Sequence, residues 1–265
     1  MPIFSFEDID FYYEDDDNNG EPFIFLHGLG GDTSQTMGIM KQTEGIRRIS
    51  MDFRGHGKTI DIGGRDKLSF EQFTRDTLAL VNHLNLEKVI IGGVSTGAGV
   101  ALRFSLTNPQ LVSKLILSRP AWKDEPQSRE IIEAYQQIYD ILVDNSVKDK
   151  KTAYKETKIY KYMKSVSSYA GETLLGQFEY PYAKDTASKL IKIPRDCPNS
   201  NRDDWKNIIF PTLILVSEQD PIHPYEYGVL LNNFIPNSSL KRITPKEVSG
   251  QQHNIDSYNF ICDFV

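Results

Sequence analysis

The chain has 265 residues, of which 39% are hydrophobic and 25% charged, and its formal net charge at pH 7 is -6. This length and composition suit one large globular domain, or a core that carries an insertion. The acidic balance leaves no surplus of Lys and Arg to neutralise phosphates. It therefore argues against nucleic acid and anionic membrane as partners and favours a small molecule.

The amino terminus and the two cysteines indicate the cellular compartment in which the protein is expected. Residues 1–11 contain neither a basic segment nor a continuous apolar segment, so no signal peptide is predicted. No other stretch is apolar over a length that could span a bilayer. Cys197 and Cys262 lie in different neighbourhoods without metal-ligand spacing, which favours two reduced thiols. We therefore expect a cytoplasmic protein.

Short apolar runs alternate with helical patterns along the chain. Two alternating segments, 3–6 and 9–13, precede the acidic turn EDDDNNG and predict an opening hairpin. Further runs predict strands that are buried on both faces, at residues 23–26, 48–53, 89–92, 114–117 and 212–216. Ser69 and Gln72 form a predicted capping box before a helix. This alternation predicts an α/β fold with a mostly parallel sheet flanked by helices.

The alternation stops between about Trp122 and Asn207, where Lys, Glu and Tyr become frequent. We predict a helical cap at residues 121–205, with residues 1–120 and 206–265 forming the α/β core. Clustered aromatic residues there suit a bulky, largely apolar ligand with some polar groups, although many of them could simply pack the helices together. Trp122, Tyr135 and Tyr169 are the predicted substrate contacts.

A GxSxG sequence, formed by residues 93–97, lies between a predicted strand and a predicted helix beginning at Ala98. Glycine on both sides of Ser95 permits a tight turn that lifts the hydroxyl above the sheet edge. The amino-terminal dipole of the helix favours the negative charge that develops in acyl transfer. An ordinary glycine-rich loop is the alternative, but the strand before and the helix after it indicate that Ser95 is a nucleophile.

This unit resembles the nucleophile elbow of the α/β-hydrolase superfamily, and the resemblance covers nearly the whole chain. Residues 27–31, HGLGG, follow the first core strand, where that family has its oxyanion loop. The resemblance implies the backbone amides of Leu29 and Thr96 as oxyanion donors and a structural role for His27. It also implies the α/β-hydrolase fold, with the cap inserted after strand 6.

A second segment, DFRGHG at residues 52–57, is similar to the DxRGxG turn of the same family. Its charged residues usually hold loops together there. Asp52, Arg54 and His56 are therefore expected to be scaffold.

A serine hydroxyl needs a histidine oriented by a carboxylate before it can attack. With the family order Ser, acid, His, the resemblance implies Asp220 as the acid and His253 as the base, the latter just before a terminal helix. Glu218 is the alternative acid. His223 stands only three residues after Asp220 and is expected at the rim.

Two departures from the family pattern lie close to these residues. Ser217 and Gln252 stand where the family commonly has glycine, so the resemblance implies the assignment of Asp220 and His253 but not the exact geometry of their loops.

Several activities share this fold and stay open. A serine at the elbow disfavours the haloalkane dehalogenase and epoxide hydrolase branches, which attack through a carboxylate. We expect a serine hydrolase that cleaves a carboxylic ester or lactone through an acyl-enzyme, without metal or organic cofactor. Carbon–carbon bond hydrolases, cofactor-free lyases and perhydrolase-like activities use similar triads. A non-catalytic ligand receptor or interaction protein is the alternative of another class.

The segment SRPAW, residues 118–122, leads into the cap in a way that resembles a group of bacterial capped hydrolases. The general layout is also loosely similar to serine-dependent macrolide esterases, which open macrolactone antibiotics. A macrolactone is therefore one candidate substrate.

Overall fold

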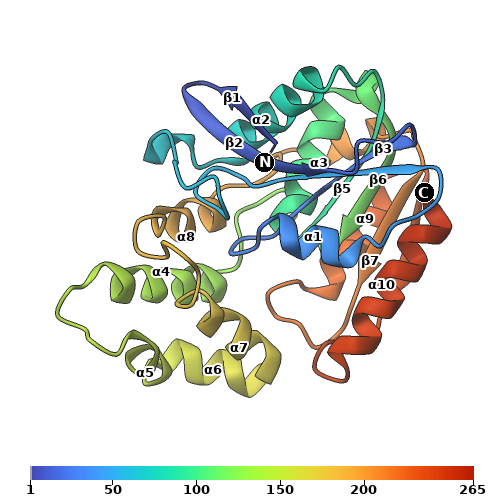
Figure 1. Ribbon diagram of the computed structural model, residues 1–265. Helices are drawn as coiled ribbons and strands as arrows, with labels where there is room; N and C mark the ends of the chain where they lie inside the picture. The colour runs from blue at the N-terminus through green and yellow to red at the C-terminus, as the bar shows by residue number, and fades with distance from the viewer. Residues whose placement is uncertain (1) are drawn as a thin grey trace.

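The computed structural model describes residues 2–265 and contains an eight-stranded sheet in the order β1-β2-β4-β3-β5-β6-β7-β8 (Figure 1). Strands β1 (Ile3–Phe6) and β2 (Ile9–Asp15) form an antiparallel hairpin. Its turn residues, Glu7 and Asp8, have φ of 48° and 62°, as a tight two-residue hairpin turn requires. The predicted hairpin is present, and the acidic EDDDNNG segment leads out of β2 toward β3.

The remaining strands are β3 (Glu21–Leu26), β4 (Ile46–Met51), β5 (Val89–Val94), β6 (Val112–Ser118), β7 (Thr212–Val216) and β8 (Ser238–Arg242). β2 pairs antiparallel with β4, and the pairs from β4 onward along the sheet are parallel. β5 and β7 are buried over their whole length, which explains their continuous apolar sequences. The predicted α/β fold with a mostly parallel sheet is confirmed.

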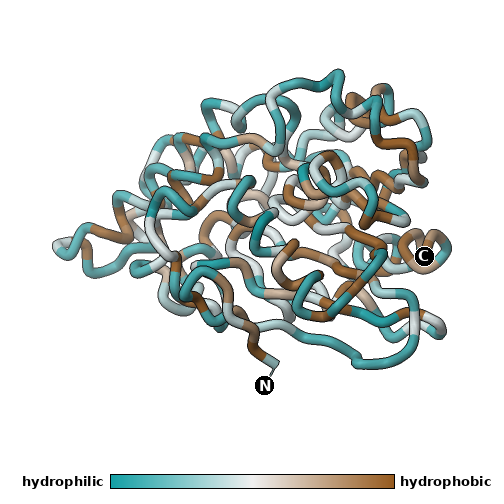
Figure 2. Tube along the Cα trace, turned by 90° about the horizontal axis from the view of Figure 1, so that it is seen from above, coloured by the Kyte–Doolittle hydropathy of each residue, from teal (hydrophilic) through white to brown (hydrophobic). Residues whose placement is uncertain are grey.

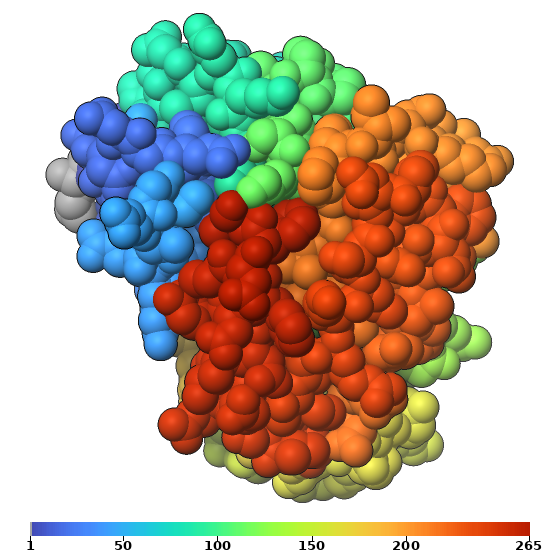
Figure 3. All heavy atoms as spheres, turned by 90° about the vertical axis from the view of Figure 1, so that its right-hand side faces the viewer, coloured from blue at the N-terminus to red at the C-terminus, as the bar shows by residue number. Residues whose placement is uncertain are grey.

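Helices cover both faces of the sheet (Figure 1). Helices α1 (Thr33–Ile39) and α10 (Gly250–Phe264) contact each other on one face. Helices α2 (Phe70–His83), α3 (Thr96–Thr107) and α9 (Tyr225–Phe234) lie on the other, with two 3-10 turns at Arg65–Lys67 and Pro109–Leu111. In Figure 3 the C-terminal residues of α10, drawn in dark red, lie between the blue residues of the α1 region and the orange residues of the β7–β8 region.

The sheet separates two apolar layers. The layer under α2 and α3 includes Phe70, Phe73 and Phe104, all fully buried. The layer under α1 and α10 includes Phe25, Ile116 and Ile261. In Figure 2 the apolar segments run through the interior, and the peripheral loops are mostly hydrophilic.

Serine residues cap two of these helices in the same way. The Ser69 side chain accepts a hydrogen bond from the amide of Gln72, so the predicted helix start is present at α2. The reciprocal half of the predicted capping box is absent, because the Gln72 side chain donates to Glu7 and Asp76 instead. Ser249 accepts from the amide of Gln252 at 3.1 Å and starts α10 at Gly250. The prediction that the terminal helix begins after His253 is therefore wrong, because this cap places His253 in the first turn.

Five helices stand between β6 and β7: α4 (Arg129–Val143), α5 (Lys150–Lys155), α6 (Lys158–Val166), α7 (Ser168–Gly176) and α8 (Ser188–Lys192). Two 3-10 segments, η3 (Ile193–Arg195) and η4 (Arg202–Asn207), lead back to the sheet. The helices bury a cluster of their own that includes Ile138 and Leu174. In contrast, Trp122 and Trp205, near the ends of the predicted cap, pack in the main core.

None of the helices within residues 2–265 has the length and apolarity that a membrane span requires.

Candidate active site

Ser95 occupies the turn between β5 and α3, with φ 57° and ψ -114°. This backbone conformation is strained for a residue with a side chain and typical of a nucleophile elbow. The flanking glycines explain why the turn can be so tight. A Cβ on Gly97 would lie 2.1 Å from the carbonyl oxygen of Leu26, and one on Gly93 would lie 2.4 Å from the carbonyl carbon of Gly97.

Two backbone amides near Ser95 are free to meet an oxyanion. Thr96 is the first residue of α3, so its amide has no acceptor within the helix. The Leu29 amide makes no hydrogen bond within residues 2–265, and Leu29 lines the same cavity as Ser95. The loop that carries Leu29 is held by Gln35, whose Oε1 accepts from the Gly28 amide at 2.9 Å.

The carboxylate of Asp220 is paired with His223, not with His253. Nδ1 of His223 lies 2.7 Å from Oδ2 of Asp220, and both side chains are buried. Burial alone would raise the pKa of Asp220, but His223 and Arg119 beside it hold that pKa well below its usual range. His223 lines the cavity that contains Ser95, whereas the sequence predicted it at the rim. The alternative acid, Glu218, is half-exposed and pairs with Arg242.

His253 is paired with no carboxylate in the described part of the chain. Its Nδ1 donates to the carbonyl of Thr244 at 2.8 Å, and the ring lies in the first turn of α10. Burial, followed by the nearby charges of Arg119 and Lys246, lowers the pKa of His253 to about 3. An imidazolium at this position would be destabilised by burial and by two cations. The expected pairing of His253 with Asp220 is thus not present in the structure.

The cavity at Ser95 has a volume of about 70 Å³ and is lined partly by the helical insertion. Tyr135 of α4 and Tyr169 of α7 line it, together with Leu29 and Ile222. Trp122 does not line it. Its ring packs edge-on against Phe70 in the main core, with ring centroids 5.0 Å apart, so the predicted substrate contact of Trp122 is absent.

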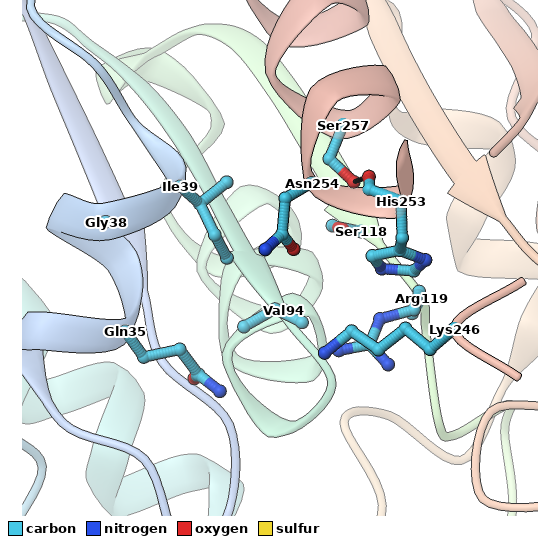
Figure 4. A pocket seen from close by; sticks show the side chains of 10 residues that line it. All are labelled: Gln35, Gly38, Ile39, Val94, Ser118, Arg119, Lys246, His253, Asn254 and Ser257. Carbon is cyan, nitrogen blue, oxygen red and sulfur yellow. Dashed lines mark hydrogen bonds between the residues drawn. The ribbon is translucent and has the colours of Figure 1, made fainter. Parts of the chain in front are cut away.

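A larger cavity of about 280 Å³ adjoins the first (Figure 4). The two share Gln35, Val94, Arg119 and Lys246 in their walls. Figure 4 shows His253, Asn254 and Ser257 projecting from α10 around the larger cavity, across from Gln35 and Ile39 of the α1 region. Within residues 2–265, no cluster of three or more His, Cys, Asp or Glu side chains is arranged to hold a metal ion.

Two cations in the cavity walls, Arg119 and Lys246, were not predicted. Arg119 directly follows β6 and has φ 45°, and its guanidinium lies 3.4 Å from Asp220. Lys246 lies between β8 and α10 and donates to the Tyr169 hydroxyl at 2.6 Å. A signal for Arg119 was available, since parallel sheets place functional side chains just beyond the carboxyl ends of their strands. Nothing in the sequence marks Lys246.

The residues expected to be scaffold make structural contacts. His27 Nε2 accepts from the Phe53 amide at 3.0 Å, while its Nδ1 lies 2.8 Å from the Gly28 carbonyl. Arg54 forms a buried bidentate pair with Asp76 at 2.6 and 2.7 Å. These contacts fix the loops beneath the oxyanion loop.

Comparison with known proteins places the chain in a family. The family model for the alpha/beta hydrolase fold matches residues 21–247. A Pseudomonas putida protein, 2-hydroxy-6-oxononadienedioate/2-hydroxy-6-oxononatrienedioate hydrolase 2, is 28% identical over 272 residues, covering 97% of this chain and 92% of the relative. A non-heme chloroperoxidase from Burkholderia pyrrocinia is 24% identical over 257 residues, covering 91% and 90%.

Solved structures agree on the fold. The enol-lactonase from Burkholderia xenovorans LB400 matches with a TM-score of 0.77, covering 99% of both chains at 17% sequence identity. The family match over most of the chain, the serine elbow and the sheet order lead to one conclusion: this chain belongs to the α/β-hydrolase fold family.

Proposed function

We propose that this protein is a serine hydrolase that cleaves a carboxylic ester or lactone through an acyl-enzyme on Ser95. The observation that carries the proposal is the strained elbow, which holds Ser95 in a cavity beside the amides of Leu29 and Thr96. Such a constellation serves acyl transfer, because the oxyanion develops where the amides can bind it.

In the proposed mechanism, Oγ of Ser95 attacks the carbonyl carbon and its proton passes to Nε2 of His223. Asp220 stabilises the imidazolium through the hydrogen bond to Nδ1, and the alcohol then leaves with that proton. Water then attacks the acyl carbon while His223 takes one of its protons. The bond to Oγ of Ser95 breaks, His223 returns the proton to Oγ, and the carboxylic acid is released. His223 is preferred to His253 because only His223 has a carboxylate to stabilise its charged form.

The proposed cap, residues 121–205, helps to determine the size of substrate that the cavity at Ser95 can hold. Tyr135 and Tyr169 contribute aromatic walls at the cavity, but the volume beside Ser95 is small. This size favours a compact acyl group over the bulky apolar substrate, or macrolactone, that the aromatic density of the cap suggested. The macrolactone remains an outcome of the test below.

A second candidate is hydrolysis of a carbon–carbon bond. The Pseudomonas putida relative, whose name describes a hydrolase of 2-hydroxy-6-oxo dienedioates, aligns with 97% of this chain. Such a reaction also needs a serine and a histidine, so the two candidates differ in substrate rather than in residues.

The test combines active-site labelling with product analysis. A fluorophosphonate probe should label Ser95 in the wild type and leave Ser95→Ala unlabelled, whereas Ser165→Ala, which changes an exposed serine, should label normally. A panel of short aryl esters, simple lactones, macrolactones and ring-cleavage diketones, followed by mass spectrometry, then identifies the bond. Full turnover by Ser95→Ala would end the proposal and revive a non-catalytic binding role.

A further inference from the structure

We infer that Arg119 and Lys246 bind a carboxylate group of the substrate, so that the protein acts on esters or lactones that carry a separate carboxylate. This inference rests on the proposed function and names the substrate class for the same site.

The charges in the cavity walls are unbalanced. Arg119 and Lys246 line both cavities, and none of the described residues contributes an acidic side chain to either lining. Within residues 2–265, Asp220 is the only carboxylate that pairs with Arg119, and Asp220 also pairs with His223. Two cations against one carboxylate leave one positive charge, and a singly charged anion would balance it. A carboxylate fits this count better than a doubly charged phosphate.

Arg119 and Lys246 also have hydrogen-bond donors that no protein acceptor within residues 2–265 uses. Within residues 2–265 the guanidinium of Arg119 donates only to Asp220, at 3.4 Å, and its Nε is buried without a partner. Because a guanidinium carries five donors, most of its hydrogen-bonding capacity is unused. The ammonium of Lys246 donates to the Tyr169 hydroxyl, which leaves two further protons. Like charges held together at a buried site favour an anion between them.

Arg119 and Lys246 lie close enough to the cavity at Ser95 to contact a substrate whose reacting bond is at Ser95. They stand at the junction of the small cavity with Ser95 and the larger cavity beside α10. In Figure 4 the side chains of Arg119 and Lys246 both point into the larger cavity, and burial together with the charge of Arg119 lowers the pKa of Lys246. A substrate could therefore place its carbonyl at Ser95 while a carboxylate a few bonds away meets both cations.

The test uses two esters matched in chain length, mono-4-nitrophenyl adipate and 4-nitrophenyl hexanoate. Wild-type protein should show a higher kcat/KM for the adipate ester. Lys246→Met should lower the ratio of the two kcat/KM values by about 10-fold or more, the size expected for a lost hydrogen bond to a charged group. The control Lys241→Met removes an exposed lysine of β8 and should leave the ratio unchanged. Lys246→Arg keeps the charge and should retain much of the preference.

A binding measurement separates this inference from the proposed function. Calorimetry of monomethyl adipate, which carries a single carboxylate, with Ser95→Ala should detect binding that Lys246→Met in the same background weakens about 10-fold or more, even if no ester is turned over. Binding together with absent hydrolysis would keep the carboxylate site and overturn only the ester reaction. An equal ester ratio in wild type and Lys246→Met, or tighter binding of inorganic phosphate than of monomethyl adipate, would overturn the inference.

Discussion

Nδ1 of His223 lies 2.7 Å from Oδ2 of Asp220, only three residues earlier in the chain. The pair is local because the turn after β7 also directs the amides of Ile222 and His223 to Oδ1 of Asp220. An acid and a histidine from one turn form a rigid unit. His253, from a different element, is held by the Thr244 carbonyl instead.

The same substitution at His223 and at His253 tests which of the two histidines is the general base. His223→Asn should lower kcat about 1000-fold or more, because asparagine cannot accept the proton from Ser95. His253→Asn should have a much smaller effect, since an asparagine amide can still donate to Thr244. Steady-state kinetics on one ester, with circular dichroism to check folding, decides the matter. The opposite order of effects would assign the base to His253.

The rate should depend on pH through His223. Burial lowers the pKa of His223 below its ordinary value of 6.5, although Asp220 opposes this shift. A base must be neutral, so a lowered pKa keeps it active to lower pH. We expect kcat/KM to be flat near neutrality and to fall tenfold per pH unit only below pH 6.5. A pH–rate profile of wild type checks this, and a fall that begins above pH 7 would contradict it.

Stability should respond to acid through His253. Its folded pKa of about 3 lies below 6.5, so folding favours the neutral ring. The contribution is fully present above pH 6.5 and is lost as the pH falls toward 3, by at most about 1.4 kcal/mol per pH unit. His253→Asn should therefore flatten the loss of unfolding free energy between pH 7 and pH 4, measured by urea unfolding. The exposed His83→Asn should retain the wild-type slope.

Tyr180 ties the helical insertion to the oxyanion loop. Its hydroxyl donates to the Gly31 carbonyl at 2.8 Å and accepts from the Gly57 amide at 2.5 Å. Tyr180→Phe should lower the unfolding free energy by about 1–2 kcal/mol and also reduce kcat, because the loop with Leu29 loses a support. Tyr182→Phe, which alters a tyrosine that is 54% exposed, is the control. Equal effects of both changes would argue against this role.

The elbow glycines should tolerate no side chain. Gly97→Ala would bring a Cβ to 2.1 Å from the Leu26 carbonyl, so β3 or α3 must move. We expect a loss of about 3 kcal/mol in thermal or urea unfolding, together with loss of fluorophosphonate labelling. Gly176→Ala meets nothing within 4 Å and should be neutral or slightly stabilising. A stable, labelled Gly97→Ala variant would show that the elbow can relax.

The start of α10 carries the same local sequence signal as the start of α2. Ser249 and Gln252 repeat the Ser-x-x-Gln spacing that correctly predicted the start of α2 at Ser69. Applied at the end of the chain, the same rule places His253 inside the helix. The family resemblance implies a base before the helix, and this local rule contradicts it in agreement with the structure.

The sequence by itself determined the features that depend on neighbours in the chain. Continuous apolar runs marked the strands from β3 to β7, and the glycines around Ser95 marked the elbow, because strand burial and turn sterics act over a few residues. The break in alternation also located the helices between β6 and β7.

Only the tertiary structure decided which side chains meet at Ser95. Arg119, His223 and Lys246 come from separate stretches of chain, and their charges have no periodicity that a sequence would reveal. Trp122 and Tyr135 looked alike as aromatic residues of the cap, yet one packs in the core and the other lines the cavity. Contacts between distant segments depend on how the sheet and the inserted helices pack, and local patterns carry no information about that packing.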